Sequence, residues 1–181
     1  MNENLLLPFY LLETPDHMVR TLDSYWQQDA RWLEQTHDYI QWMFPLVVRS
    51  NYNPHAPVLT DQVRQAFELT DQHESKVLQD NLSRSTQCML GFYGYDVVAG
   101  DINRACDWQE KSRKWLNNGN HNHLRITRIL RSLNLLGQGD LAQALLAEFE
   151  NSIEQTSAPV PRETRLLWKN AAAPNVASSL N

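Results

Sequence analysis

The chain has 181 residues, of which 42% are hydrophobic, and this is enough apolar material for one ordinary domain with a sizeable core. Twenty-one acidic residues outnumber sixteen basic ones, and the net charge of −5 argues against binding nucleic acid by bulk attraction. Nowhere does the sequence contain the roughly 18 consecutive apolar residues of a bilayer-spanning helix, so we expect no transmembrane segment.

The cysteines favour a reducing compartment. Cys88 and Cys106 are too few for a disulfide framework and form no CxxC pair. The first twelve residues contain an apolar stretch, but they lack the basic start and the small-residue cleavage site of a secretion signal. We therefore expect a cytoplasmic protein.

Helical spacing of apolar residues predicts two consecutive helices over residues 21–44, with a break near 35–38. Asp29 or Thr36 can cap the start of a helix, because an oxygen side chain there satisfies a free backbone N–H. Pro45 is expected to end the second helix, because it has no backbone donor to continue it.

Residues 45–59 predict an ordered loop, because they hold three prolines and two asparagines that favour turns. Thr60 is expected to cap the helix that follows. A further helix should end at Gly91 or Gly94, where glycine can adopt a left-handed backbone conformation.

In the C-terminal half, residues 95–107 look irregular, and a short helix is expected over 108–116. The stretch 122–136 is the clearest helix of the chain, because its apolar residues share one face at the 3.6-residue period. Asp140 can cap the next helix, which should end near Glu154.

These elements predict an all-α protein: a single compact multi-helix domain with irregular connecting loops. We expect the helical domain to span residues 1–156 and a flexible, loosely ordered tail to span 157–181, because the tail holds three prolines amid Ala, Ser and Asn. A short helix around Thr164–Lys169 is the only element expected within the tail.

Four sequence blocks carry a resemblance to a known family: HDYIQWMFP at residues 37–45, NPHAPVL at 53–59, MLGFYG at 89–94 and HLRITRIL at 123–130. In this order and at these spacings they resemble the conserved region of the opioid growth factor receptor family, over roughly residues 20–150. The resemblance implies a compact helical domain. The resemblance also implies a relationship to the animal member that names the family. That member is a receptor for an enkephalin-type peptide, restrains cell growth and associates with the nucleus.

One candidate binding group lies at the start of the helix at 122–136. His121, Arg125 and Arg128 are spaced i, i+4 and i+7, so they project from one side if the helix includes His121. Two guanidinium groups on one face can clamp a carboxylate or phosphate of a ligand. The structural alternative is a solvated helix face paired with local acids.

A second candidate group lies in the first block. His37 and Gln41 are one helical turn apart and lie next to Trp42, so they can border a pocket that combines aromatic surface with hydrogen-bonding groups. A peptide with an aromatic side chain would suit such a pocket. The alternative is that the aromatic residues build the core and His37 bonds a loop carbonyl.

No metal, cofactor or catalytic residue is expected. His121 and His123 face apart on a helix, and the sequence has no HExxH pattern and no CxxC pair. The acids of the 95–107 loop do not follow the calcium-loop spacing, and the glycines of 90–95 lack the GxGxxG and Walker spacings. Cys88 lies in a predicted apolar helix with no adjacent base.

These observations favour a non-enzymatic recognition module that binds a peptide or protein segment, with His37, Gln41 and Trp42 near Arg125 and Arg128. One alternative is an enzyme acting on a phosphorylated or nucleotide-containing substrate, with His37 or His121 as the proton carrier. The other alternative is a scaffold that dimerises through an apolar helix face. The sequence leaves the oligomeric state open.

Overall fold

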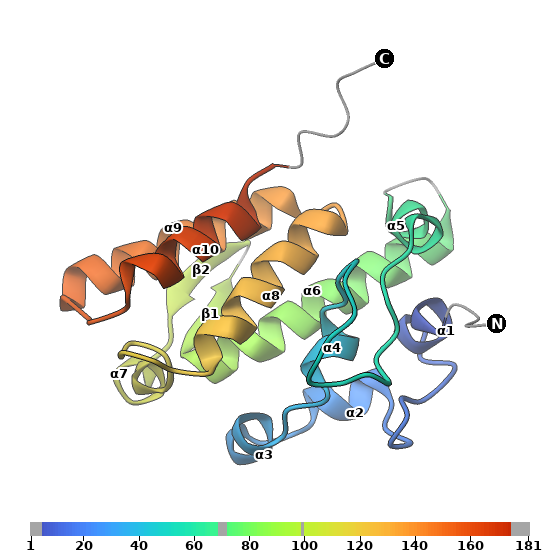
Figure 1. The fold of residues 1–181 in the computed structure, drawn as a ribbon, viewed down its shortest axis with the longest axis horizontal. Coiled ribbons are helices and arrows are strands. Elements are labelled where there is room, and N and C mark those ends of the chain that lie inside the picture. Colours follow the sequence, from blue (N-terminus) through green and yellow to red (C-terminus); the bar gives the residue numbers. More distant parts are fainter. Residues whose placement is uncertain (1–4, 69–71, 99, 175–181) are drawn as a thin grey trace. The chain divides into compact units, whose positions relative to one another are not determined.

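The structure, a computed structural model, describes residues 5–68, 72–98 and 100–174. Helices dominate it, and the strands among these residues form one two-stranded sheet, which confirms the predicted all-α class (Figure 1). The chain divides into two compact units, Met1–Met89 and Leu90–Asn181, here called unit 1 and unit 2.

Unit 1 is built from short helices and the first part of one long helix. Two of the short helices begin at the caps that the sequence indicates: Asp29 accepts a hydrogen bond from the Trp32 backbone N–H at 2.7 Å, and Thr60 accepts one from that of Val63 at 3.3 Å. The helices are α1 (Leu6–Tyr10), α2 (Leu22–Trp26), α3 (Ala30–Gln35), α4 (Ile40–Met43), α5 (Asp61–Phe67) and α6 (His73–Tyr93), of which residues 73–89 belong to this unit.

Aromatic side chains form the core of unit 1. The ring centroids of Phe9 and Trp42 are 5.0 Å apart. The Tyr10 ring meets the Phe67 ring edge-on, with 5.1 Å between their centroids. The Asn81 side chain of α6 donates to the Tyr10 backbone carbonyl at 2.7 Å. Helices of four to seven residues are not stable alone, so this core and α6 hold them in place.

Unit 2 begins with a hairpin in a segment that the sequence analysis expected to be irregular. Strands β1 (Tyr95–Val98) and β2 (Asp101–Arg104) pair antiparallel, with Tyr95 opposite Arg104. Tyrosine and valine favour a strand, and Gly100, with φ of +91°, supplies the left-handed conformation that the turn needs. Each strand has only four residues, so the alternation of apolar and polar residues is too short to predict a strand from the sequence.

Three long helices of unit 2 pack against one another. Buried Trp115, Phe149 and Trp168 meet at their centre, with ring centroids 5.0 to 6.4 Å apart. The elements after the hairpin are α7 (Trp108–Lys111), the 3-10 helix η1 (Ser112–Lys114), α8 (Asn122–Leu135), α9 (Gly139–Thr156) and α10 (Arg162–Ala172).

Helix α10 lies within the segment that the sequence analysis assigned to the tail. It packs on α8 and α9 because Trp168 is fully buried and donates from its indole N–H to the His123 backbone carbonyl at 3.1 Å. The expected short helix at 164–169 is therefore the middle of a longer, packed one. Residues 175–181 of the predicted tail lie outside the described residues.

Candidate functional site

A tight turn over Asp16–Arg20 in unit 1 is held by hydrogen bonds from both its backbone and its side chains. The Asp16 backbone N–H donates to the Arg20 carbonyl at 2.8 Å, which closes the turn. One carboxylate oxygen of Asp16 accepts from the backbone N–H groups of Met18 and Arg20, each at 2.8 Å. Aspartate stabilises turns in this way because its side chain reaches backbone donors two residues ahead.

The second carboxylate oxygen of Asp16 is held by two neighbouring side chains. Arg20 donates to it from Nε at 2.8 Å, and the Tyr25 hydroxyl donates at 2.5 Å. Burial by itself would raise the pKa of Asp16, but the hydrogen bonds from Arg20 and Tyr25 hold this pKa below its ordinary value. Arg20 also donates to Asp38 at 3.0 Å, so one guanidinium joins two carboxylates.

The turn holds Val19 in a strained backbone conformation. Three described non-glycine residues have positive φ: Leu12, Val19 and Ser157. Leu12 and Ser157 close the ends of α1 and α9, where a left-handed residue is common. Val19, with φ of 61°, follows no helix, and its side chain is 82% exposed. A β-branched residue in this region is a true outlier, which the surrounding hydrogen bonds must enforce.

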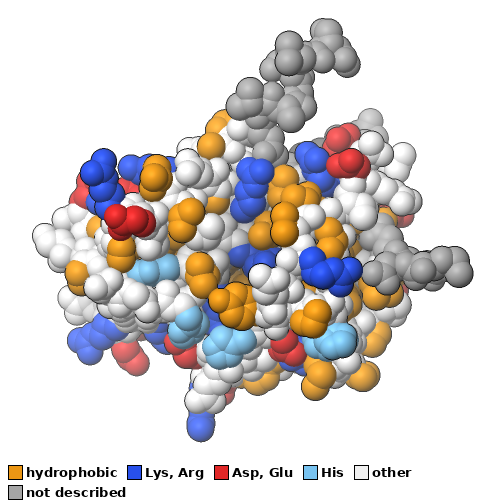
Figure 2. Space-filling view, viewed as in Figure 1, with side chains coloured by type: hydrophobic (Ala, Val, Ile, Leu, Met, Phe, Trp, Pro, Cys, Tyr) orange, Lys and Arg blue, Asp and Glu red, His pale blue; other side chains and the backbone are white. Residues whose placement is uncertain are grey.

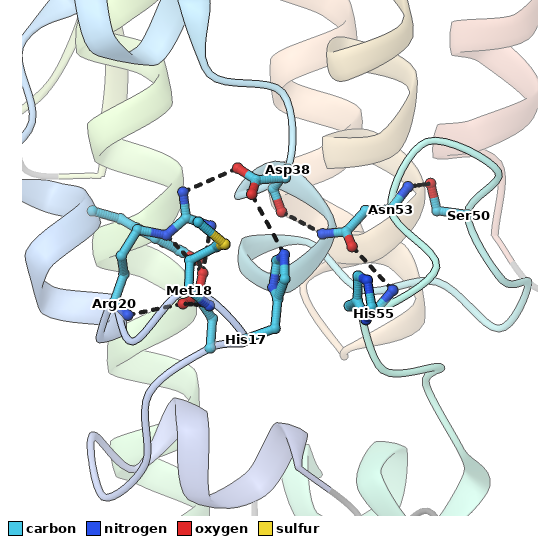
Figure 3. A network of polar contacts seen from close by, with 9 residues as sticks. His17, Met18, Arg20, Asp38, Ser50, Asn53 and His55 are labelled. Carbon is cyan, nitrogen blue, oxygen red and sulfur yellow. Dashed lines mark hydrogen bonds and ion pairs between the residues drawn. The ribbon is translucent and has the colours of Figure 1, made fainter.

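His17 of this turn stacks on His55 of a second loop (Figure 3). The His17 ring lies parallel to Trp42 at 6.1 Å and 8°, and the His55 ring lies 5.1 Å from His17 at 15°. His17 Nε2 is also 3.5 Å from the Asp38 carboxylate. The stack therefore places the Asp16–Arg20 turn next to the loop that carries His55.

That second loop, residues 44–60, is held by Asn53. The buried Asn53 side chain donates to the Asp38 backbone carbonyl at 2.7 Å and accepts from the His55 backbone N–H at 3.1 Å (Figure 3). Three of the loop's apolar side chains project into solvent. We call the exposed set from both loops the loop surface: Met18, Val19, Val47, Val48 and Tyr52, with His17 and His55.

Three of the six binding residues expected from the sequence belong to unit 1. His37 is exposed just before α4, whereas Gln41 and Trp42 lie within α4 and are buried, Trp42 to 98%. The Gln41 Oε1 and Trp42 Nε1 atoms have no hydrogen-bond partner among the described residues. Trp42 is part of the core, as the structural alternative held, and one face of its ring is covered by His17.

The other three expected residues belong to unit 2. His121 is exposed before α8, and buried Arg125 donates to the Asn122 side chain at 3.2 Å. Burial lowers the pKa of Arg128 to about 10, which leaves its guanidinium charged at neutral pH. The convergence of these residues with His37, Gln41 and Trp42 stays a prediction.

Sequence reasoning missed His17 and the role of His55. His55 lies in the NPHAPVL block that carries part of the family resemblance, so that block offered a signal. The sequence offers no such signal for His17, because its stacking partner His55 lies 38 positions away in the chain.

Unit 2 contains a separate buried polar cluster around Ser152. The Ser152 hydroxyl lies 2.8 Å from the Tyr95 hydroxyl, accepts from Arg104 at 2.9 Å and lies 3.2 Å from a Glu148 carboxylate oxygen. Because Ser152 is fully buried and these groups surround its hydroxyl, the cluster links the hairpin to α9 and offers no accessible nucleophile.

Two general features of the described ranges bear on function. No group of three or more His, Cys, Asp or Glu side chains in those ranges is arranged to hold a metal ion. No described helix is both long enough and apolar enough to cross a membrane.

The sequence is similar to a defined group of proteins. A family model described as the opioid growth factor receptor conserved region matches residues 2–168. The opioid growth factor receptor of Rattus norvegicus is 38% identical over 153 residues, which are 82% of this chain and 25% of that protein. The human receptor is 37% identical over 145 residues, which are 78% of this chain and 20% of that protein.

A third relative is the opioid growth factor receptor-like protein 1 of Xenopus tropicalis, which is 33% identical over 172 residues, 91% of this chain and 32% of that protein. The chain thus spans about a third or less of the length of these relatives. No solved structure matches it. Because the family model covers nearly the whole sequence, the chain belongs to the opioid growth factor receptor family.

Proposed function

We propose that the chain is a recognition module that binds a peptide or protein segment at the loop surface of unit 1, without catalysing a reaction on it. The observation that carries the proposal is the strained and exposed Val19. Its left-handed backbone conformation costs roughly 1–2 kcal/mol, and the buried Asp16 network enforces it. Strain of this kind is concentrated at ligand-binding sites.

The chemistry of the loop surface supports an apolar ligand contact. Apolar side chains gathered on adjacent loops differ from the isolated exposed leucine of an ordinary surface, and such gatherings mark interaction sites. Tyr52, which is 81% exposed, offers the ring and hydroxyl that are enriched at interfaces. Because hydrogen bonds hold both loops, ligand binding would order few additional residues, and this favours affinity.

Polar groups beside the apolar residues can orient the ligand. Asp38 keeps about a third of its side chain exposed while it contacts Arg20 and His17, and it can accept a hydrogen bond from a ligand amine or amide. The exposed rings of His17 and His55 offer nitrogen atoms beside the same apolar residues. This combination of a few polar groups with apolar surface is typical of ligand sites.

The relatives' names indicate which ligand to test first. Proteins named opioid growth factor receptor are receptors for a growth factor by that name, and an opioid-type peptide is therefore the first candidate for this chain. The match covers at most a third of those proteins. For this chain we therefore propose the ligand only by its class, a peptide or protein segment.

The test is a heteronuclear NMR titration of the uniformly ¹⁵N-labelled chain with an enkephalin-type peptide and with peptides enriched from a random library. We expect the largest shift changes at residues 16–20 and 47–56. Peptides that bind but perturb only unit 2, or a library from which no binder is enriched, would contradict the proposal.

A paired variant sharpens this test. Replacing Met18 and Val48 by serine removes two apolar side chains without touching the core, and we expect about tenfold weaker binding of the enriched peptide. The matched control is Leu124→Ser, which removes an exposed leucine from α8 in unit 2 and should leave the affinity unchanged.

A further inference from the structure

Helix α10 carries a basic stripe with a leucine at its centre. Arg162, Arg165, Leu166 and Lys169 are spaced i, i+3, i+4 and i+7, so they lie on one face of the helix. They line a surface hollow of about 400 Å³. Leu166 is 57% exposed, and basic and hydrophobic side chains lie next to one another over α9 and α10 in Figure 2.

The opposite face of α10 is firmly attached to unit 2. Trp168 is buried against α8, and the side chains of Asn134 and Gln143 donate to backbone carbonyls at the C-terminal end of α10, including those of Ala171 and Ala172. The stripe is therefore presented by a fixed helix. A ligand would not need to order it before binding.

Neighbouring acids neutralise the stripe only in part. Arg165 is paired with Glu150 and Glu154 of α9, and Lys169 lies 3.9 Å from the same Glu150. Arg162 makes no ion pair within the part of the chain that the structure describes. Three cations face two carboxylates, and this leaves an excess of positive charge in a chain whose net charge is −5.

We propose that this stripe is a second docking surface, which binds an acidic segment of a partner protein that presents carboxylates on either side of an apolar side chain. Arg162 and Lys169 lie on either side of Leu166 along the helix, so an amphipathic acidic helix matches both the charge and the spacing. Glu150 and Glu154 of α9 border the stripe, so its positive charge lies along one helix face, and a helical protein segment fits this narrow line better than a broad lipid surface. The proposal is independent of the loop surface, which belongs to unit 1.

The probe for the test is a synthetic helical peptide with glutamate and leucine at helical spacing, and the control is the same peptide with glutamine in place of glutamate. We expect the acidic peptide to shift the amide signals of α10 and to bind more weakly as salt is raised. The double variant Arg162→Glu with Lys169→Glu should bind about tenfold more weakly. Arg113→Glu, which changes an exposed cation of η1, should bind like the natural chain.

Circular dichroism checks the fold of each variant, and Leu166→Ser provides a second loss-of-binding variant if the double charge reversal unfolds. Equal binding of the glutamine peptide, or unchanged binding after charge reversal, would overturn the proposal. So would anionic-lipid vesicles that retain the chain while the acidic peptide does not bind. Because shifts at α10 and shifts at residues 16–20 are separate readouts, failure here is distinguishable from failure of the proposed function.

Discussion

The two units reach their stability by different means. In unit 2 three helices of 11 to 18 residues bury one apolar face each around a tryptophan cluster. In unit 1 five helices of four to seven residues precede α6 among the described residues, and hydrogen bonds between the backbone and the side chains of Asp16 and Asn53 set the shape of the loops that join them. Regular helix packing thus builds unit 2, whereas polar side chains fix the loops that carry the loop surface of unit 1.

The largest effect is expected from a change at the centre of unit 2. Trp168→Ala should lower the free energy of unfolding by about 3–5 kcal/mol, because it leaves a cavity and removes the hydrogen bond from the indole N–H to the His123 carbonyl. Denaturant unfolding followed by circular dichroism measures the loss. Leu167→Ala, its exposed neighbour, should change stability by about 0.5 kcal/mol or less. Similar losses in both variants would show that α10 is not part of the core.

In unit 1 the corresponding change is polar. Asp16→Asn should lower the free energy of unfolding by about 2–3 kcal/mol, because the fully buried carboxylate loses its charge while Arg20 and Tyr25 still need an acceptor. Hydrogen exchange of the amides of Met18 and Arg20 should accelerate in this variant. Unchanged exchange at both amides would mean that the turn does not depend on the carboxylate.

The two units should also differ in their response to acid. Burial lowers the pKa of His123 below its ordinary 6.5, so the neutral form stabilises unit 2 above that pH, and the contribution falls as pH drops through the lowered folded value. The pKa of Asp16 is lowered from 3.8, so its contribution to unit 1 is complete above that pH and is lost only below it.

Hydrogen exchange at pH 7.5, 5 and 3 measures the two responses separately. We expect amides of α8 to lose protection first and amides of the Asp16–Arg20 turn to lose it last. His123→Gln should flatten the first step, since it removes the titrating ring. Loss of protection in the turn before α8 would contradict this order.

The same contrast explains what could be predicted from the sequence. The helix at 122–136 and the caps at Asp29 and Thr60 were predictable, because apolar periodicity and capping are local patterns. The family was predictable from its four blocks. The packing of α10 was not, because its short apolar pattern matters only once Trp168 meets α8.

The loop surface was beyond local patterns. Gln41 and Trp42 stood out as candidates because they lie in a family block, but the ring stack of His17 and His55 joins loops that are distant in the sequence. Likewise, the sequence around Val19 does not indicate a positive φ at this position. Glycine or asparagine is the usual signal for that conformation, and position 19 is a valine.

The variant Val19→Gly tests most directly whether the fold holds a strained turn that presents apolar side chains to a ligand. Glycine adopts positive φ without strain, so we predict a gain of about 1 kcal/mol in the free energy of unfolding together with weaker binding of a peptide enriched against the natural chain. Stability measured by denaturant unfolding and affinity measured by titration should thus move in opposite directions. Unchanged affinity in the stabilised variant would contradict the claim.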